Sequence, residues 1–203
     1  MNKTIKKLTI AVVALSLVLL GVVGGVVAWL TAESGTVTNT FSYGSIALTL
    51  EETRDSITNT TGFAYTNVVP GDKLEKKAAV TVTDGSENCY VYILINNELN
   101  GSASLDIQAN WKKVVEDGNW VLYRYTDSEI TDANMDTPLT IFEYLTFKNE
   151  LTKANLDALE TASAEVVVWA YAHQAEHVEK ADADKAAQKW AITKGATWAD
   201  PTP

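Results

Sequence analysis

Apolar residues alternate with polar or small residues in two short segments, residues 45–50 and residues 77–83. Successive side chains of a β-strand point to opposite faces, so this alternation predicts strands with one apolar face. The apolar faces are formed by Ile46, Leu48 and Leu50 in the first segment and by Ala78, Val80 and Val82 in the second.

A third segment, residues 88–96, is apolar on both faces. A strand of this kind has to be covered on both sides, so we predict that it is central in its sheet. One face carries Cys89, Val91, Ile93 and Ile95, and the other carries Tyr90, Tyr92 and Leu94.

A β-hairpin is predicted where residues 111–115 and 120–125 flank the sequence Glu116-Asp117-Gly118-Asn119. The Asp-Gly pair is typical of tight hairpin turns, because these turns need backbone conformations with positive φ. Segments rich in Val, Ile, Thr and aromatic residues favour two more strands, at residues 139–147 and 164–171.

Two short helices and one further turn complete the pattern. Residues 152–160 begin with Thr152 as a candidate cap, and residues 181–192 have acidic residues near their start and Lys189 near their end. The sequence Pro70-Gly71-Asp72 predicts a turn before the strand at residues 77–83.

Seven strands with two minor helices predict an all-β fold, a two-layer β-sandwich in which each sheet buries one alternating face. The pattern fits a jelly-roll and an immunoglobulin-like topology equally well. We expect the sandwich domain to span residues 45–196 and the tail, residues 197–203, to be loose.

The N-terminus has the pattern of an export leader. Lys3, Lys6 and Lys7 precede an uncharged run over residues 8–32, and such a basic start with a long apolar stretch directs a chain to the membrane export machinery. We expect residues 1–28 to be a signal peptide cut after Ala28, followed by a flexible segment, residues 29–44. Cleavage after Ala32 and retention as a membrane anchor are the alternatives.

Net charge and cysteine content limit which molecules can bind this chain and which cross-links it can form. The 203-residue chain has a net charge of −10, and removal of three leader lysines changes this to −13 because no acidic residue is lost. So acidic a surface repels nucleic acid, and its association with other chains depends on salt. Cys89 is the single cysteine, so no internal disulfide can form, and its apolar surroundings predict a buried thiol.

Two stretches of the chain carry a recognisable combination of motifs. The first is the leader junction with the first strand, residues 28–31, 39–41 and 44–50. The second is a Pro-Gly-Asp turn before a later strand, residues 69–74 and 80–82. Together these stretches resemble the exported TasA and camelysin family of Gram-positive bacteria.

This resemblance implies a jelly-roll-like sandwich secreted to the cell surface, with a leader that is cut by a SipW-type signal peptidase. TasA-like members form fibres of the biofilm matrix, which implies association with other copies or with related matrix subunits. Camelysin-like members have been described as surface metalloproteases. The choice between a fibre subunit and a protease therefore depends on the residues of this chain.

The one motif that suggests catalysis is His173-Gln174-Ala175-Glu176-His177. On a helix, the His-x-x-Glu-His spacing places two imidazoles one turn apart beside a carboxylate, the inverzincin arrangement. A catalytic zinc needs three protein ligands, and no glutamate follows Glu179. The candidates for the third ligand are Asp182, Asp184 or a residue brought in from upstream. If the preceding strand continues through His173, the two histidines separate.

Aromatic residues gather on the predicted hairpin and have two interpretations. Trp111, Trp120, Tyr123 and Tyr125 can form a platform for a sugar or protein ligand, or they can stabilise the sheet as cross-strand pairs, which is the commoner role. The pair Asp182 and Asp184 lacks the glycine and distal glutamate of a calcium loop and is better explained as helix capping.

The sequence therefore favours a secreted, cell-surface-associated and non-enzymatic building block of a fibre, biofilm matrix or surface layer. We assign no catalytic, cofactor-binding or metal-binding residue. The expected partners are the signal peptidase and other copies or related subunits, with membrane contact only through an uncleaved leader. In the assembly hypothesis, residues 33–50 form a strand that adds to an open sheet edge of a neighbour. A zinc-dependent surface protease and a monomeric adhesin are the alternatives.

Overall fold

The computed structural model describes residues 45–60, 65, 67–99, 101–126 and 128–202. The predicted leader and the segment that follows it, residues 1–44, lie outside the described residues. The elements are β1 (Leu48–Arg54), β2 (Ile57–Asn59), β3 (Lys73–Val82), β4 (Cys89–Asn97), β5 (Ala103–Leu105), β6 (Trp111–Asp117), β7 (Trp120–Tyr125), η1 (Asp132–Asn134), β8 (Leu139–Phe147), α2 (Lys153–Thr161), β9 (Val166–Gln174) and α3 (Lys180–Thr193).

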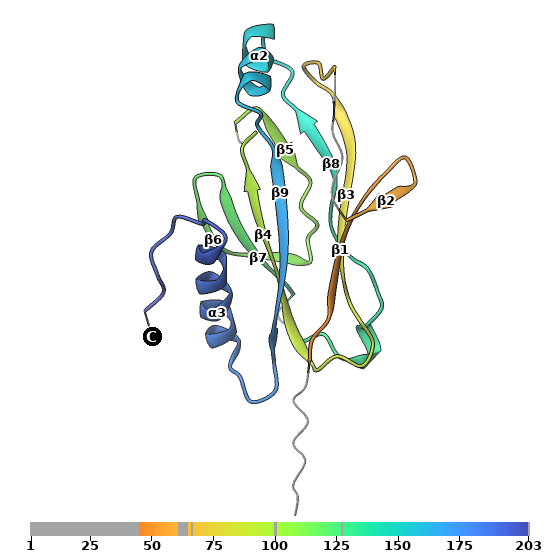
Figure 1. The fold of residues 1–203 in the computed structure, drawn as a ribbon, viewed down its shortest axis with the longest axis vertical. Helices are drawn as coiled ribbons and strands as arrows, with labels where there is room; N and C mark the ends of the chain where they lie inside the picture. Colours follow the sequence, from red (N-terminus) through yellow and green to blue (C-terminus); the bar gives the residue numbers. More distant parts are fainter. Residues whose placement is uncertain (1–44, 61–64, 66, 100, 127, 203) are drawn as a thin grey trace, which may run out of the picture. The chain divides into compact units, whose positions relative to one another are not determined.

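The strands form two antiparallel sheets that pack face to face (Figure 1). The first sheet has the order β2-β1-β3-β8-β5, and the second has the order β6-β7-β4-β9. The prediction of an all-β two-layer sandwich with two helices is confirmed. Within the described residues, no helix has the length and apolar character needed to cross a bilayer.

The core between the sheets is built from the predicted alternating faces. Ala78, Val80 and Val82 of β3 are buried there, and Leu48 and Leu50 of β1 pack beside them. β1 pairs with β3 so that Leu48 lies opposite Val82 and Leu50 opposite Val80. The apolar row of each strand therefore points inward, as its sequence pattern predicts.

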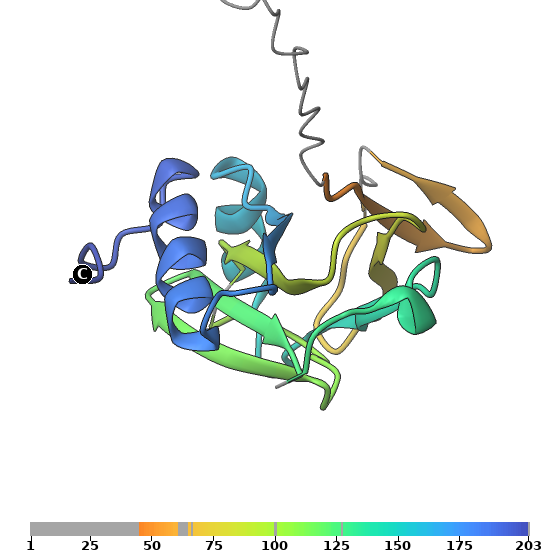
Figure 2. The ribbon, with the colours of Figure 1, turned by 90° about the horizontal axis from the view of Figure 1, so that it is seen from below.

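β4 is an inner strand of the second sheet, and both of its faces are covered. Its odd-numbered side chains, including the fully buried Ile93, belong to the inter-sheet core. Tyr92 and Leu94 point to the other face, where they pack against three small residues of α3. These residues are Ala183, Ala187 and Ala191. Figure 2 shows α3 lying over this face of the second sheet. The prediction of a central strand is confirmed.

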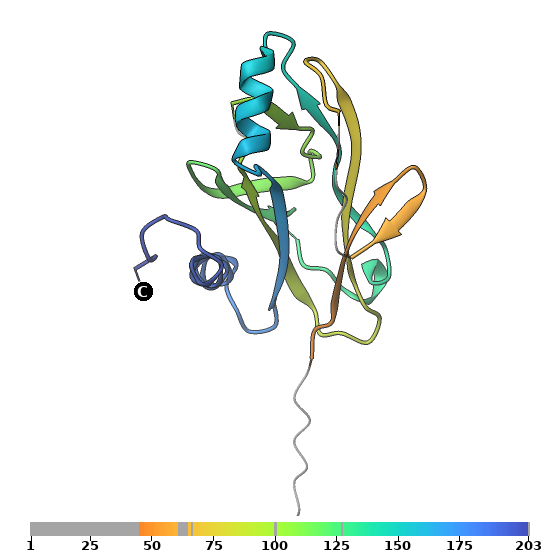
Figure 3. The same ribbon diagram turned by 45° about the horizontal axis from the view of Figure 1, so that its top comes forward.

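α2 covers one end of the sandwich (Figure 3). Its first residue follows Thr152, whose side chain accepts a hydrogen bond from the backbone of Asn155, and Asn155 bonds back to the backbone of Thr152. This capping box fixes where the helix begins. Leu156 and Leu159 then pack against a small core cluster that includes Phe147 of β8.

The predicted hairpin is present, with β6 and β7 joined by Gly118 and Asn119. Gly118 has the positive φ, 58°, while Asp117 pairs with Trp120 at the end of the ladder. β2 and β5 were not predicted, because each has three residues and is too short to show an alternating pattern. The predicted strand at residues 164–171 is β9, which continues to Gln174 and therefore includes His173.

The tail beyond α3 makes two hydrogen bonds to the domain, although its sequence predicts a loose segment. The hydroxyl of Thr197 donates to Oδ2 of Asp117 at 2.7 Å, and the indole N–H of Trp198 donates to the carbonyl of Gln188 at 3.4 Å. Trp198 also packs against the cluster under α3.

Candidate functional site

β9 is a long edge strand, because β4 is the one strand that pairs with it among the described residues. Its nine residues, Val-Val-Val-Trp-Ala-Tyr-Ala-His-Gln, contain no Asp, Glu, Lys, Arg or Pro. Proteins usually protect a sheet edge with charges, prolines, bulges or short strands. None of these devices is present along β9, so this edge is suited to accept another strand.

The three other sheet edges are poorer acceptors. β2 and β5, the edges of the first sheet, have three residues each. β6, the other edge of the second sheet, carries Lys112, Lys113 and Glu116, and its register with β7 shifts between Lys113 and Val115. Charges and a register shift both discourage further pairing.

Within the part of the chain that the structure describes, alternate residues of β9 direct their backbone groups away from β4. Ala175 donates to the carbonyl of Asn88, and Glu98 donates to the carbonyl of Glu165. These two bonds flank the ladder, so the odd-numbered residues of β9 bond to β4 in the antiparallel pattern. The N–H and C=O groups of the even-numbered residues then point to the open edge. These residues are Val166, Val168, Ala170, Ala172 and Gln174.

A groove of about 1340 Å³ lies beside the first half of β9. It is bounded by β1, β3, β8, α2 and the connection between β2 and β3. Much of its surface is apolar, from Leu74, Leu145, Phe147, Leu156, Leu159, Val166 and Val168. An added strand would find hydrogen-bond partners along β9 and an apolar surface for its inward side chains.

Among the polar side chains that line this groove, Lys76, Glu52 and Tyr65 form one cluster. Nζ of Lys76 lies 2.5 Å from Oε2 of Glu52, and the two side chains are 6% and 13% exposed. The hydroxyl of Tyr65 donates to the carbonyl of Glu75 at 2.7 Å and lies 3.2 Å from Oε1 of Glu52. Burial and the nearby carboxylate of Glu52 raise the pKa of Tyr65. The groove therefore contains a buried ion pair.

The structure corrects the extent of the proposed donor segment, residues 33–50. Leu48, Thr49 and Leu50 belong to β1 and pair with β3 of the same chain. The prediction that they are free to join a neighbour is therefore wrong. Residues 33–44, which lie outside the described residues, are the part of the segment that is left for this role.

His173, Glu176 and His177 do not form the helical arrangement that the alternative of a zinc protease requires. His173 lies in β9, and its Nδ1 is 2.9 Å from the carbonyl of Gln174. His177 lies in the loop before α3 with a φ of 61°, and its imidazole is 89% exposed. Nε2 of His177 is 3.4 Å from Oε1 of Glu176. Among the described residues, no three His, Cys, Asp or Glu side chains are grouped as a metal site.

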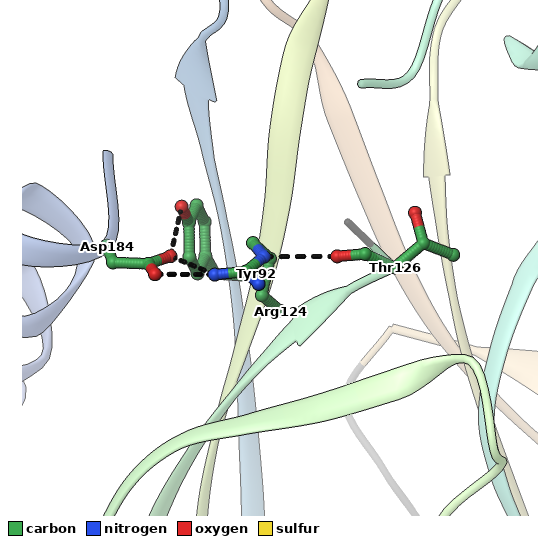
Figure 4. A network of polar contacts seen from close by, with 4 residues as sticks. All are labelled: Tyr92, Arg124, Thr126 and Asp184. Carbon is green, nitrogen blue, oxygen red and sulfur yellow. Dashed lines mark hydrogen bonds and ion pairs between the residues drawn. The ribbon is translucent and has the colours of Figure 1, made fainter. Parts of the chain in front are cut away.

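Asp184, a candidate third zinc ligand, is engaged elsewhere (Figure 4). Its carboxylate accepts from the Arg124 guanidinium at 2.5 and 2.6 Å and from the Tyr92 hydroxyl at 2.9 Å. Arg124 also donates through Nε to the carbonyl of Thr126 at 3.0 Å. Burial, followed by the bond to Asp184, raises the pKa of Tyr92. This network fastens α3 to the second sheet.

The aromatic residues of the hairpin do not form one platform. Trp111 is buried in the inter-sheet core, where its ring packs edge-on against Tyr125 at 5.1 Å and its N–H donates to the carbonyl of Thr140 at 2.7 Å. Trp120 belongs to the opposite face and stacks on Trp169 at 5.7 Å. The predicted sheet-stabilising role fits this arrangement, and sequence reasoning missed Trp169 as the partner of Trp120.

Cys89 is fully buried in the inter-sheet core, as its sequence context predicts. Burial raises the pKa of its thiol to about 11. Nucleophilic cysteines need a depressed pKa and access to solvent, and Cys89 has neither.

No protein-family model, curated protein or solved structure matches this chain. The inference of function therefore depends on the open edge of β9, on the groove beside it and on the sequence of the N-terminal segment.

Proposed function

We propose that the mature chain is a secreted, non-enzymatic structural building block of an extracellular fibre, biofilm matrix or surface layer. In this proposal each copy accepts a strand from a neighbouring copy, or from a related subunit, along the open edge of β9. The observation that carries the proposal is the combination of that uncharged nine-residue edge with the groove beside it.

The pairing supplies two kinds of energy. The backbone groups of the even-numbered β9 residues gain main-chain hydrogen bonds, which give affinity in strand-addition complexes. The inward side chains of the added strand bury apolar surface in the groove, at about 25 cal/mol per Å². The edge is then no longer exposed, so assembly also removes an aggregation hazard.

The donor strand in this proposal is residues 33–44 of the neighbour. Cleavage after Ala28 would free this segment, and its composition, rich in Thr with Val37, Phe41 and Tyr43, favours an extended strand. Twelve residues in a strand span about 40 Å, which exceeds the length of β9 at about 3.3 Å per residue. The resemblance of the leader junction to TasA-like fibre proteins supports the same role.

The high negative charge sets the conditions for assembly. With a net charge of −13 after removal of the leader, copies repel one another at low ionic strength. Salt shortens the range of this repulsion, to about 10 Å at 0.1 M. We therefore expect salt or divalent cations to favour assembly.

Deletion of the donor tests the proposal. Mature protein, residues 29–203, and a variant without residues 33–44 are purified as monomers and incubated at equal concentration. Negative-stain microscopy and sedimentation should show fibres for the first and folded monomers for the second. A synthetic peptide of residues 33–44 should block fibre growth by the mature protein. Fibres that form equally well without residues 33–44 would remove the donor role.

A further inference from the structure

The apolar lining of the groove is interrupted by a polar band. Lys76 and Glu52 occupy core-facing positions of β3 and β1, in rows that are otherwise apolar along the groove. Leu74 and Ala78 lie two residues to either side of Lys76, and Leu50 lies two residues before Glu52. A strand that enters the groove therefore meets apolar surface, then a buried ion pair, then apolar surface again.

The ion pair has hydrogen-bonding capacity to spare. A lysine ammonium has three N–H donors. Within the described part of the chain, Glu52 is the hydrogen-bond partner of Lys76, and the Tyr65 ring lies near the ammonium, with its centroid 5.9 Å from Nζ. Both charged side chains line the groove and are nearly buried. An entering side chain that can both donate and accept would satisfy these groups, whereas an apolar one would leave them desolvated.

The donor segment has the complementary pattern. In an extended strand, Val37, Asn39, Phe41 and Tyr43 share one face, and Thr38 and Thr40 lie on the other. Asn39 is the amide side chain in this otherwise apolar or aromatic row. Its carboxamide has an acceptor oxygen and a donor nitrogen, which suit Lys76 and Glu52 respectively.

We infer that Asn39 of one copy binds the Lys76–Glu52 ion pair of the next copy and thereby sets the register of the added strand. This inference rests on the proposed function, because it assigns the side chain that the groove selects. Val37 and Phe41 then pack on the apolar surfaces on either side of the ion pair. The match holds for either strand direction, because Asn39 is flanked by an apolar residue two positions away on both sides.

The ion pair makes other registers unfavourable. A slip of one residue turns the apolar row of the donor away from the groove. A slip of two residues puts Val37 or Phe41 against the buried charges, which then lose water without gaining a hydrogen-bond partner. Buried ion pairs contribute little net stability, and selection of one arrangement is the better-supported use of such a pair.

Two matched substitutions in the donor test the register. Asn39→Leu removes the amide from the inward row, and Thr38→Leu adds the same apolar side chain to the opposite face. In full-length mature protein, Asn39→Leu should raise the critical concentration for fibre assembly about tenfold or more, because a hydrogen bond to a charged group is lost. Thr38→Leu should change it less than about threefold. Equal effects of the two substitutions would overturn the inference.

A change in the groove provides the reciprocal test. Glu52→Leu combined with Lys76→Met replaces the ion pair by apolar side chains, a change that folded proteins often tolerate. In this background, Asn39→Leu should lower the critical concentration instead of raising it. A double variant that folds and still assembles best with Asn39 would overturn the inference. If the double variant does not fold, the comparison of Asn39→Leu with Thr38→Leu decides alone.

Fibres that persist without residues 33–44 would contradict the proposed function, whereas fibres that need those residues but tolerate Asn39→Leu would contradict the register only.

Discussion

Nζ of Lys76 lies 2.5 Å from Oε2 of Glu52, at core-facing positions of β3 and β1 beside the groove. The ion pair is placed where the alternation of both strands calls for apolar residues. The ion pair therefore lies on the core-facing side of β3 and β1 and also lines the groove beside β9. The same feature gives a prediction for the isolated monomer and one for the assembled protein.

Loss of one partner of this ion pair should destabilise the monomer strongly. Lys76→Met leaves the Glu52 carboxylate buried without its cation, which costs about 3–5 kcal/mol in comparable cases. Combining Lys76→Met with Glu52→Leu should recover most of that loss. Urea unfolding of the variant without residues 33–44 measures both effects without interference from assembly. A single variant as stable as the parent would contradict this account.

The network around Asp184 gives a second prediction. Asp184→Asn removes the charge that pairs with the Arg124 guanidinium, whose side chain is 9% exposed, and should cost about 2–4 kcal/mol of unfolding free energy. Asp182→Asn is the matched control, because the Asp182 side chain is 66% exposed and pairs with Lys185 at 3.5 Å. Its cost should stay below about 1 kcal/mol. Similar losses in the two variants would show that α3 does not depend on this network.

Gly71 should be costly to replace, because its backbone conformation is one that other residues rarely adopt. Its φ is 85°, and an added Cβ would lie 2.3 Å from Oδ1 of Asn149, the end of an exposed side chain that can rotate away. Gly85 has a φ of 77° and open space around it, so Gly85→Ala reports the backbone cost alone. We expect both substitutions to destabilise the protein by similar amounts, about 1 kcal/mol each, measured by thermal unfolding. A loss at Gly71 several times that at Gly85 would contradict this explanation and show that Asn149 does not move away.

The buried thiol of Cys89 should make the folded protein less stable at alkaline pH. Burial raises its pKa from 9.0 to about 11, so the folded protein holds the thiol proton more tightly than the unfolded chain. The contribution of Cys89 to stability is therefore complete below pH 9 and is lost as the pH rises towards 11. Cys89→Ala should remove this part of the decline between pH 9 and pH 11. A thiol reagent at pH 8 should label Cys89 only after unfolding, and rapid labelling of the folded protein would contradict its burial.

Most strands could be predicted from the sequence, because each shows a local alternation of apolar and polar residues. β8 was predicted with the bounds that the structure gives, and β4 was predicted to be covered on both faces. The position of β9 at a sheet edge depends on sheet order, which no local pattern encodes. The role of Lys76 was also missed, although the alternation at Ala78, Val80 and Val82 extends back to Lys76 and would have indicated an inward-facing lysine.

The candidate chemistry was less predictable for the same reason. The spacing of His173 and His177 suggests a zinc site only if both lie on one helix. The continuation of β9 through His173 separates them, because the strand pairs with β4 as far as Gln174. The pairing of Asp184 with Arg124 joins α3 to β7 across 60 residues of sequence, a distance at which spacing carries no information.

The open edge of β9 is tested most directly by amide hydrogen exchange of the mature protein, as monomer and after assembly. We predict that the amides of Val166, Val168, Ala170 and Ala172 exchange quickly in the monomer and become protected on assembly. The amides of Val167, Trp169 and Tyr171, which bond to β4, should be protected in both states. Fibres in which the even-numbered amides still exchange at monomer rates would contradict strand addition at β9.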